Sequence, residues 1–111
     1  MASLVCLIQS DNFEQEVIAE KKPVLLLCMR LLYMSRDEEF PRQLKVMEDI
    51  ATKYSPELKV GVLEERFIEA FKKNYGVIGT PTFLLLVEGK ERGRILGLAD
   101  HEMLTNLISH L

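Results

Sequence analysis

The chain has few cysteines, no excess of basic residues and no long hydrophobic run, and each shortage argues against a class of protein. Two cysteines in 111 residues are too few for a disulfide scaffold. Fourteen basic and seventeen acidic side chains give a net charge of −3, which argues against broad contact with nucleic acid or an anionic membrane. The longest uncharged apolar run, residues 24–29, has six residues, whereas a membrane-spanning helix needs about 20.

The chain also lacks low-complexity tracts, fixed-period repeats and Ser/Gly-rich linkers, so we expect one domain over residues 1–111. The hydrophobic fraction of 48% and the charged fraction of 28% are ordinary for a globular protein. Residues 4–8 have no basic residues before them and no small-residue cleavage site after them. They do not resemble a signal peptide, and we therefore expect a cytoplasmic protein.

Alternation of apolar and turn-forming segments predicts the element order β-α-β-α-β-α-β-β-α. Residues 24–29 are apolar without a break, as expected of a strand covered on both faces. Gly76 is expected to end the third helix and Asp100 to cap the last one. Strand–helix alternation favours parallel pairing with a late antiparallel hairpin, so we expect an α/β fold with a central mixed β-sheet flanked by helices. The strands are expected at residues 4–8, 24–29, 58–62, 82–87 and 92–98.

The first two helices each begin with a capping pattern. Asp11, with a glutamate three residues later, predicts the start of a helix that Pro23 stops. Ser35, again with a glutamate three residues later, predicts the start of a second helix. Pro41 lies about one turn into that helix and is expected to kink it.

Residues 75–82, Tyr-Gly-Val-Ile-Gly-Thr-Pro-Thr, resemble the thioredoxin stretch Tyr-Gly-Ile-Arg-Gly-Ile-Pro-Thr, in which the proline is cis. The strand after it, the Glu-Gly-Lys turn and Gly97 before the last helix match that family in spacing. The resemblance covers residues 11–111. It implies the thioredoxin fold, with the third strand between the first and second, and a cis bond between Thr80 and Pro81.

The same resemblance locates the segment that carries the redox cysteines in thioredoxins. In that family the second cysteine lies five residues before the proline of the second helix, which is Pro41 here. Counting back places Arg36 at the second cysteine and Tyr33 at the first. Leu32 stands where the family has a tryptophan, and Leu27 stands where it has a buried aspartate.

These replacements remove the groups that dithiol exchange requires. The reaction needs a thiolate nucleophile and a second thiol to resolve the mixed disulfide. The Tyr33 phenol forms no mixed disulfide, and the Arg36 guanidinium resolves none. Ser35 can instead cap the helix that thioredoxins leave open beside their thiolate. We therefore expect no catalytic residue and no cofactor, and a chain that is not an enzyme.

The leading functional hypothesis is a redox-inactive thioredoxin-like protein that binds a polypeptide in a chaperone, assembly or scaffold role. An exposed aromatic side chain beside a methionine favours contact with a partner. The other interpretation is that Leu32 and Met34 fold down onto the core. The resemblance places the expected partner-binding groove at Leu32, Tyr33, Met34, Ser35, Arg36, Thr80, Pro81 and Leu98.

Two rival hypotheses follow from other features of the sequence. An atypical thiol oxidoreductase would use Cys28 or Cys6, but both lie in apolar strands, where a cysteine is more often a core residue with a raised pKa. A homodimer built on the Tyr33–Pro81 surface would have twice the chain mass of 12.8 kDa.

The remaining polar motifs favour no metal or nucleotide site. His101 and His110 fall on roughly opposite sides of the last helix, and no Cys/His/Asp spacing resembles a zinc site. Residues 89–94 match neither a phosphate-binding loop nor a dinucleotide motif. They predict a hairpin tip with a basic outer face, with an anion site as the second interpretation.

Overall fold

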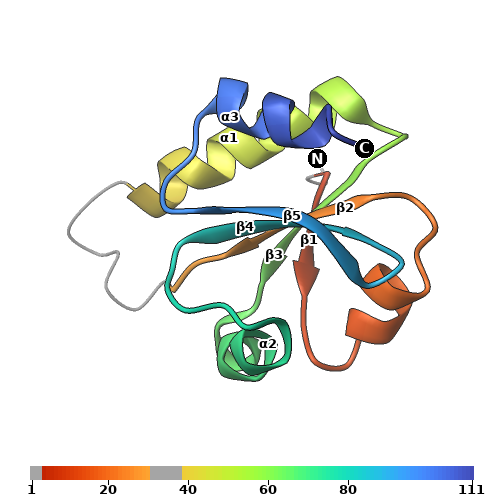
Figure 1. Ribbon diagram of the computed structural model, residues 1–111, viewed down its shortest axis with the longest axis vertical. Coiled ribbons are helices and arrows are strands. Elements are labelled where there is room, and N and C mark those ends of the chain that lie inside the picture. Colours follow the sequence, from red (N-terminus) through yellow and green to blue (C-terminus); the bar gives the residue numbers. More distant parts are fainter. Residues whose placement is uncertain (1–3, 31–38) are drawn as a thin grey trace.

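The computed structural model describes residues 4–30 and 39–111 (Figure 1). Five strands form one sheet, and helices cover both of its faces. The strands are β1 (Val5–Ile8), β2 (Val24–Cys28), β3 (Lys59–Leu63), β4 (Thr82–Val87) and β5 (Lys90–Leu96). The helices are α1 (Glu39–Tyr54), α2 (Ile68–Tyr75) and α3 (His101–Ile108), with a short π-helix η1 (Glu14–Ile18) and a 3-10 turn η3 (Glu65–Phe67). None of these helices is long and apolar enough to cross a membrane within the described residues.

The sheet is mixed, with strand order β1-β3-β2-β4-β5. β3 runs parallel to both β1 and β2, whereas β4 runs antiparallel to β2 and β5. The predicted mixed sheet, the late hairpin and the place of β3 between β1 and β2 are thus confirmed. Cys6 and Leu26 pair with Gly61 from its two sides, so the strands that carry Cys6 and Cys28 are not neighbours. Both thiols are free.

Two hydrophobic layers enclose the sheet. α1 and α3 lie side by side over one face, and α2 and η1 cover the other (Figure 1). Alternate residues of β2 point to opposite layers: Leu25 and Leu27 pack toward α1 and α3, and Leu26 and Cys28 pack toward α2. All five residues of β2 are buried, which explains the unbroken apolar run.

The first helix differs from the prediction. η1 has only five residues, no side chain caps its first turn, and it ends well before Pro23. Asn12 explains the late start, because its side chain accepts a hydrogen bond from the Gln9 N–H (2.7 Å) and donates one to the Leu7 carbonyl (3.0 Å). Such local bonds compete with a helix, so Asp11 lies in a turn and does not cap. The full helix expected between the first two strands is therefore wrong.

The fifth strand is also shifted by two residues from the predicted range of 92–98. Glu88 and Gly89 both have positive φ, 51° and 80°, which allows a tight hairpin turn of two residues. The strand therefore resumes at Lys90. Gly97 has a φ of 104°, a conformation that favours glycine, and it follows the last residue of β5.

Two local signals at helix ends are confirmed. Gly76 follows α2 in the left-handed region, with a φ of 64°, and its N–H bonds the Lys72 carbonyl. The Asp100 carboxylate caps α3 by accepting a hydrogen bond from the Met103 N–H at 2.9 Å. The Ser35 cap falls outside the described residues. Pro41 lies in α1, which the structure describes from Glu39 onward, and the kink expected there stays a prediction.

Candidate functional site

The loop between α2 and β4 carries the most exposed of the large apolar side chains in the described residues. Val77 is 5% exposed and anchors the loop in the core. The next side chain, Ile78, is 85% exposed. Burying a large aliphatic side chain gains about 1.5–3 kcal/mol, which makes Ile78 a strong potential contact for a partner.

The end of this loop is held in place before β4 begins. The Thr80–Pro81 peptide bond is cis, as predicted. The Thr82 hydroxyl donates a hydrogen bond of 2.6 Å to the Gly79 carbonyl, and Thr82 itself is fully buried. The loop is therefore fixed against the first residue of a central strand.

The loop between β5 and α3 lies beside it. The Gly97 N–H donates a hydrogen bond of 2.8 Å to the Pro81 carbonyl. Leu96 pairs with Thr82 across the hairpin, and a methyl group added at Gly79 would lie 3.9 Å from Leu96 Cδ1. Residues 78–81 and 96–98 are therefore neighbours, although they are distant in the sequence.

Together the two loops expose apolar side chains on one part of the surface. Ile78 is 85% exposed, Leu96 59% and Leu98 45%, and Pro81, which bonds Gly97 of the other segment, is half-buried. We call the surface formed by Ile78, Pro81, Leu96 and Leu98 the apolar loop patch. Exposed apolar side chains on neighbouring segments commonly mark a binding site.

Arg94 of β5 fixes the start of the first loop. Its guanidinium donates hydrogen bonds to the carbonyls of Tyr75 (2.7 Å) and Gly76 (3.1 Å) at the end of α2. It also pairs with Glu91 at 2.6 Å, and its hydrogen bond lowers the pKa of Glu91. A cation suits the negative end of a helix. Because Arg94 is engaged by these groups, the hairpin offers little support for the anion site.

Gln43 of α1 holds the second loop from the other side. Its side chain is buried, its Nε2 donates to the Ala99 carbonyl, and its Oε1 accepts from the Ala99 N–H, both at 2.9 Å. Sequence reasoning missed this residue. A signal was present, because Gln43 lies three residues after Phe40 and four before Met47, on the apolar side of the helix.

The structure brings three of the predicted groove residues together. Thr80, Pro81 and Leu98 lie on the two neighbouring loops. Sequence reasoning missed Ile78 and Leu96, since no pattern marks them as more exposed than their apolar neighbours. Leu32, Tyr33, Met34, Ser35 and Arg36 fall outside the described residues.

The described chain nevertheless approaches the apolar loop patch on both sides of segment 31–38. Before it, Cys28 of β2 pairs with Thr82, the residue after Pro81. After it, α1 reaches the second loop through the bonds between Gln43 and Ala99. β2 and α1, the described elements before and after residues 31–38, thus each contact a residue next to the patch.

Cys28 is a core residue, as the sequence indicated. Its side chain is fully buried, and burial raises the pKa of its thiol to about 11. The thiol is therefore protonated at neutral pH, whereas the nucleophile in thiol chemistry is the thiolate. Leu27 beside it is fully buried against the other layer of the core.

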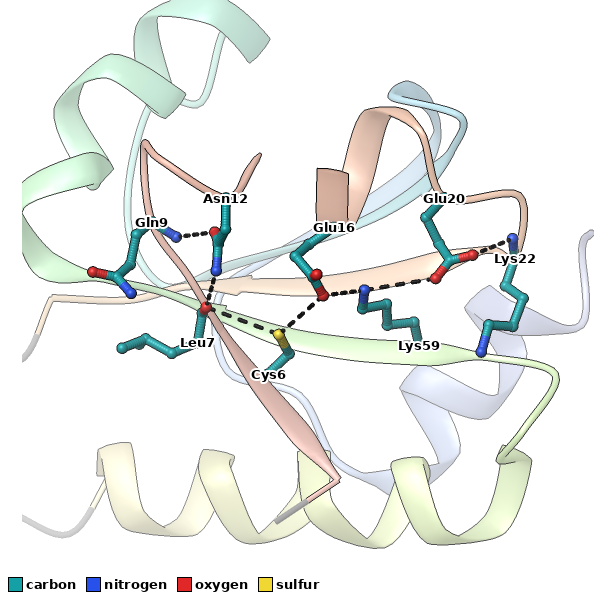
Figure 2. A network of polar contacts seen from close by, with 8 residues as sticks. All are labelled: Cys6, Leu7, Gln9, Asn12, Glu16, Glu20, Lys22 and Lys59. Atoms are coloured by element: carbon teal, nitrogen blue, oxygen red, sulfur yellow. Dashed lines mark hydrogen bonds and ion pairs between the residues drawn. The ribbon is translucent and has the colours of Figure 1, made fainter. Parts of the chain in front are cut away.

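Cys6 packs against one layer of the core but is only half-buried, so the prediction that it is a buried core residue holds only in part. β1 is an edge strand, and the strand pattern did not show that one of its sides is uncovered. Its thiol donates to Glu16 Oε1 at 3.5 Å, and the same carboxylate pairs with Lys59, which also lies 3.6 Å from Glu20 (Figure 2). Burial raises the pKa of the Cys6 thiol, Glu16 raises it further, and Lys59 lowers it by less.

The histidines lie at the surface and offer no cluster of ligands. His101 Nε2 lies 2.9 Å from Asp49 Oδ2, and His110 Nδ1 lies 2.7 Å from the Asn106 carbonyl. The described part of the chain contains no group of three or more His, Cys, Asp or Glu side chains that could hold a metal ion.

No protein-family model matches this sequence, and a search of curated proteins finds no similar one.

Proposed function

We propose that this chain is a thioredoxin-like protein without dithiol chemistry, and that it binds an extended polypeptide at the apolar loop patch. The observation that carries the proposal is the grouping of three exposed apolar side chains around Pro81: Ile78, Leu96 and Leu98. The sequence resemblance, the mixed sheet order and the cis bond before Pro81 are consistent with it.

Strand addition is the binding mode that fits this surface. In catalytic thioredoxins the cis-proline loop offers backbone groups to an extended substrate segment, a form of pairing that needs no thiol. Here the exposed Ile78 and Leu98 would receive alternate side chains of such a segment. In this proposal Tyr33 and Met34 add apolar contact, and the protein works in the cytoplasm without a cofactor.

The thiol oxidoreductase hypothesis has less support. Burial raises the pKa of both thiols, and a thiol that stays protonated is a poor nucleophile. Cys6 lies on β1 and Cys28 on β2, with β3 between those strands, so the two thiols are not placed to act as a dithiol pair.

Site-specific photo-crosslinking tests the proposal. A benzophenone amino acid would replace Ile78 and, as the matched control, Leu7, which is also exposed (52%) but lies on β1 at the other edge of the sheet. The probe is reduced and carboxymethylated α-lactalbumin, which stays unfolded and has no free thiol.

We expect a covalent adduct between chain and probe from position 78 and little from position 7. Equal yields at the two positions, or none at position 78, would contradict the proposal. An adduct between two copies of the chain at position 78, in place of the probe adduct, would favour the homodimer instead.

A further inference from the structure

A buried pair of hydrogen bonds beside the apolar loop patch joins α1 to the loop that carries Leu98. Gln43 is 6% exposed and Ala99 is 5% exposed. The Gln43 amide bonds both the N–H and the carbonyl of Ala99, each at 2.9 Å. One side chain thus bonds both backbone hydrogen-bonding groups of a loop residue, as a neighbouring strand would do in a sheet.

This contact is one of several that hold the short segment between β5 and α3. Before Leu98, the Gly97 N–H bonds the Pro81 carbonyl. After it, Ala99 bonds Gln43, and the Asp100 carboxylate begins α3 by bonding the Met103 N–H. Leu98 lies between the first two of these anchors, so the position of its side chain relative to Pro81 depends on the Gly97 bond on one side and on Gln43 on the other.

Packing alone does not account for a glutamine at this position. The surrounding layer is apolar and includes Met47, with Phe40 and Leu44 packed against it. An amide is costly to bury unless its groups are paired. Among uncharged side chains of this length, only glutamine has both an N–H donor and a carbonyl acceptor, the combination that Ala99 requires.

We propose that Gln43 is a positioning residue for the apolar loop patch. Its amide holds Leu98 in position beside Pro81 and links that position to α1, the helix that follows residues 31–38. This inference rests on the proposed function, since it gives Gln43 a role in the binding of an extended polypeptide.

The test compares Gln43→Met with a control variant in the same helix. Methionine has nearly the same length but lacks both polar groups. Ile50→Val shortens a buried side chain of α1 by one carbon, so it destabilises the same core and leaves both groups of the Gln43 amide in place. Binding of fluorescein-labelled, carboxymethylated α-lactalbumin would be measured by anisotropy, with the thermal midpoint of each variant. NMR would record the Leu98 methyl and Ala99 amide resonances.

We expect Gln43→Met to weaken binding by about tenfold or more, a change of about 1.4 kcal/mol, with shifted Leu98 methyls and faster exchange of the Ala99 amide. Ile50→Val should bind within about twofold of the wild type. If Gln43→Met does not fold, Gln43→Glu, which keeps the acceptor and loses the donor at neutral pH, takes its place.

The two proposals fail in different ways. If the wild type binds the probe and Gln43→Met binds it equally well, the role of Gln43 is overturned and the proposed function stands. Unchanged Leu98 and Ala99 resonances in Gln43→Met overturn the role of Gln43 whatever the binding result. If the wild type does not bind the probe, the proposed function fails, and the role of Gln43 in binding fails with it.

Discussion

Gly61→Ala tests the order of the strands in the sheet, because Gly61 lies in the strand between β1 and β2. Gly61 lies in β3 and pairs with Cys6 of β1 on one side and Leu26 of β2 on the other. A Cβ atom at this position would lie 2.9 Å from Ile8 Cγ1, 3.0 Å from Leu26 Cδ2 and 3.2 Å from the Cys6 carbonyl oxygen. The new methyl group would therefore press on both neighbouring strands.

The size of the effect follows from these distances. Carbon atoms pack best at about 3.5–4.0 Å, so Ile8 and Leu26 would each have to move by about 0.5–1 Å. Both side chains are fully buried. Overpacking of this kind costs about 1–3 kcal/mol, and replacing glycine within a strand returns about 0.5–1 kcal/mol. We therefore expect the free energy of unfolding to fall by about 1–2 kcal/mol. Each kcal/mol lowers the thermal midpoint of a domain of this size by about 4–8 °C.

Thermal unfolding followed by circular dichroism measures this loss, with Gly79→Ala as the matched control. The nearest atom to a Cβ at Gly79 is Leu96 Cδ1 at 3.9 Å, an ordinary contact, so that variant should keep nearly the wild-type midpoint. If Gly61→Ala were as stable as Gly79→Ala, β3 would not be packed between β1 and β2 as described.

Further predictions concern the two thiols and the ion pair between Lys59 and Glu16. Cys28 should react with iodoacetamide at pH 7 only as fast as the protein unfolds. Cys6 should react faster in Glu16→Gln than in the wild type, because that change lowers the pKa of its thiol. Mass spectrometry measures both rates. Insulin reduction by the chain with dithiothreitol should not exceed the background rate, and turnover above it would restore the thiol enzyme hypothesis. The bond from Lys59 lowers the pKa of Glu16, so the stability from this pair is present at neutral pH and is lost as the pH falls through that lowered pKa. In Lys59→Met the thermal midpoint should therefore fall less between about pH 6 and pH 3 than in the wild type, and an equal fall would show that the pair contributes nothing.

Local signals in the sequence predicted much of the fold. The unbroken apolar runs gave β2 and β4 because both strands are buried on their two faces. Gly76 and Asp100 marked helix ends correctly, since a left-handed residue and a cap act within one turn of the chain. The first helix failed because Asn12 offers its neighbours other hydrogen bonds. A capping pattern does not show whether the capped helix start or the turn held by Asn12 is favoured.

The candidate site was less predictable because it depends on contacts between distant residues. Gln43 bonds Ala99 across 56 positions of sequence. Its place on the apolar side of α1 indicates that it is buried, but it does not show which group the amide bonds. The exposure of Ile78 and Leu96 depends on how two loops pack. Cys6 was predicted to lie in the core because a short apolar strand has the same hydrophobic pattern at the edge of a sheet as at its centre.

The most direct test of the account is the affinity of the chain for carboxymethylated α-lactalbumin before and after one change to the apolar loop patch. Ile78→Asp places a charge on the most exposed member of the patch, at a side chain that is 85% exposed and adds little to the core. Leu111→Asp is the control, because Leu111 is also exposed (48%) but lies at the last position of the chain. The account predicts that Ile78→Asp weakens binding by about tenfold or more at an unchanged thermal midpoint, and that Leu111→Asp binds as the wild type does. Equal affinity of Ile78→Asp and the wild type would contradict it.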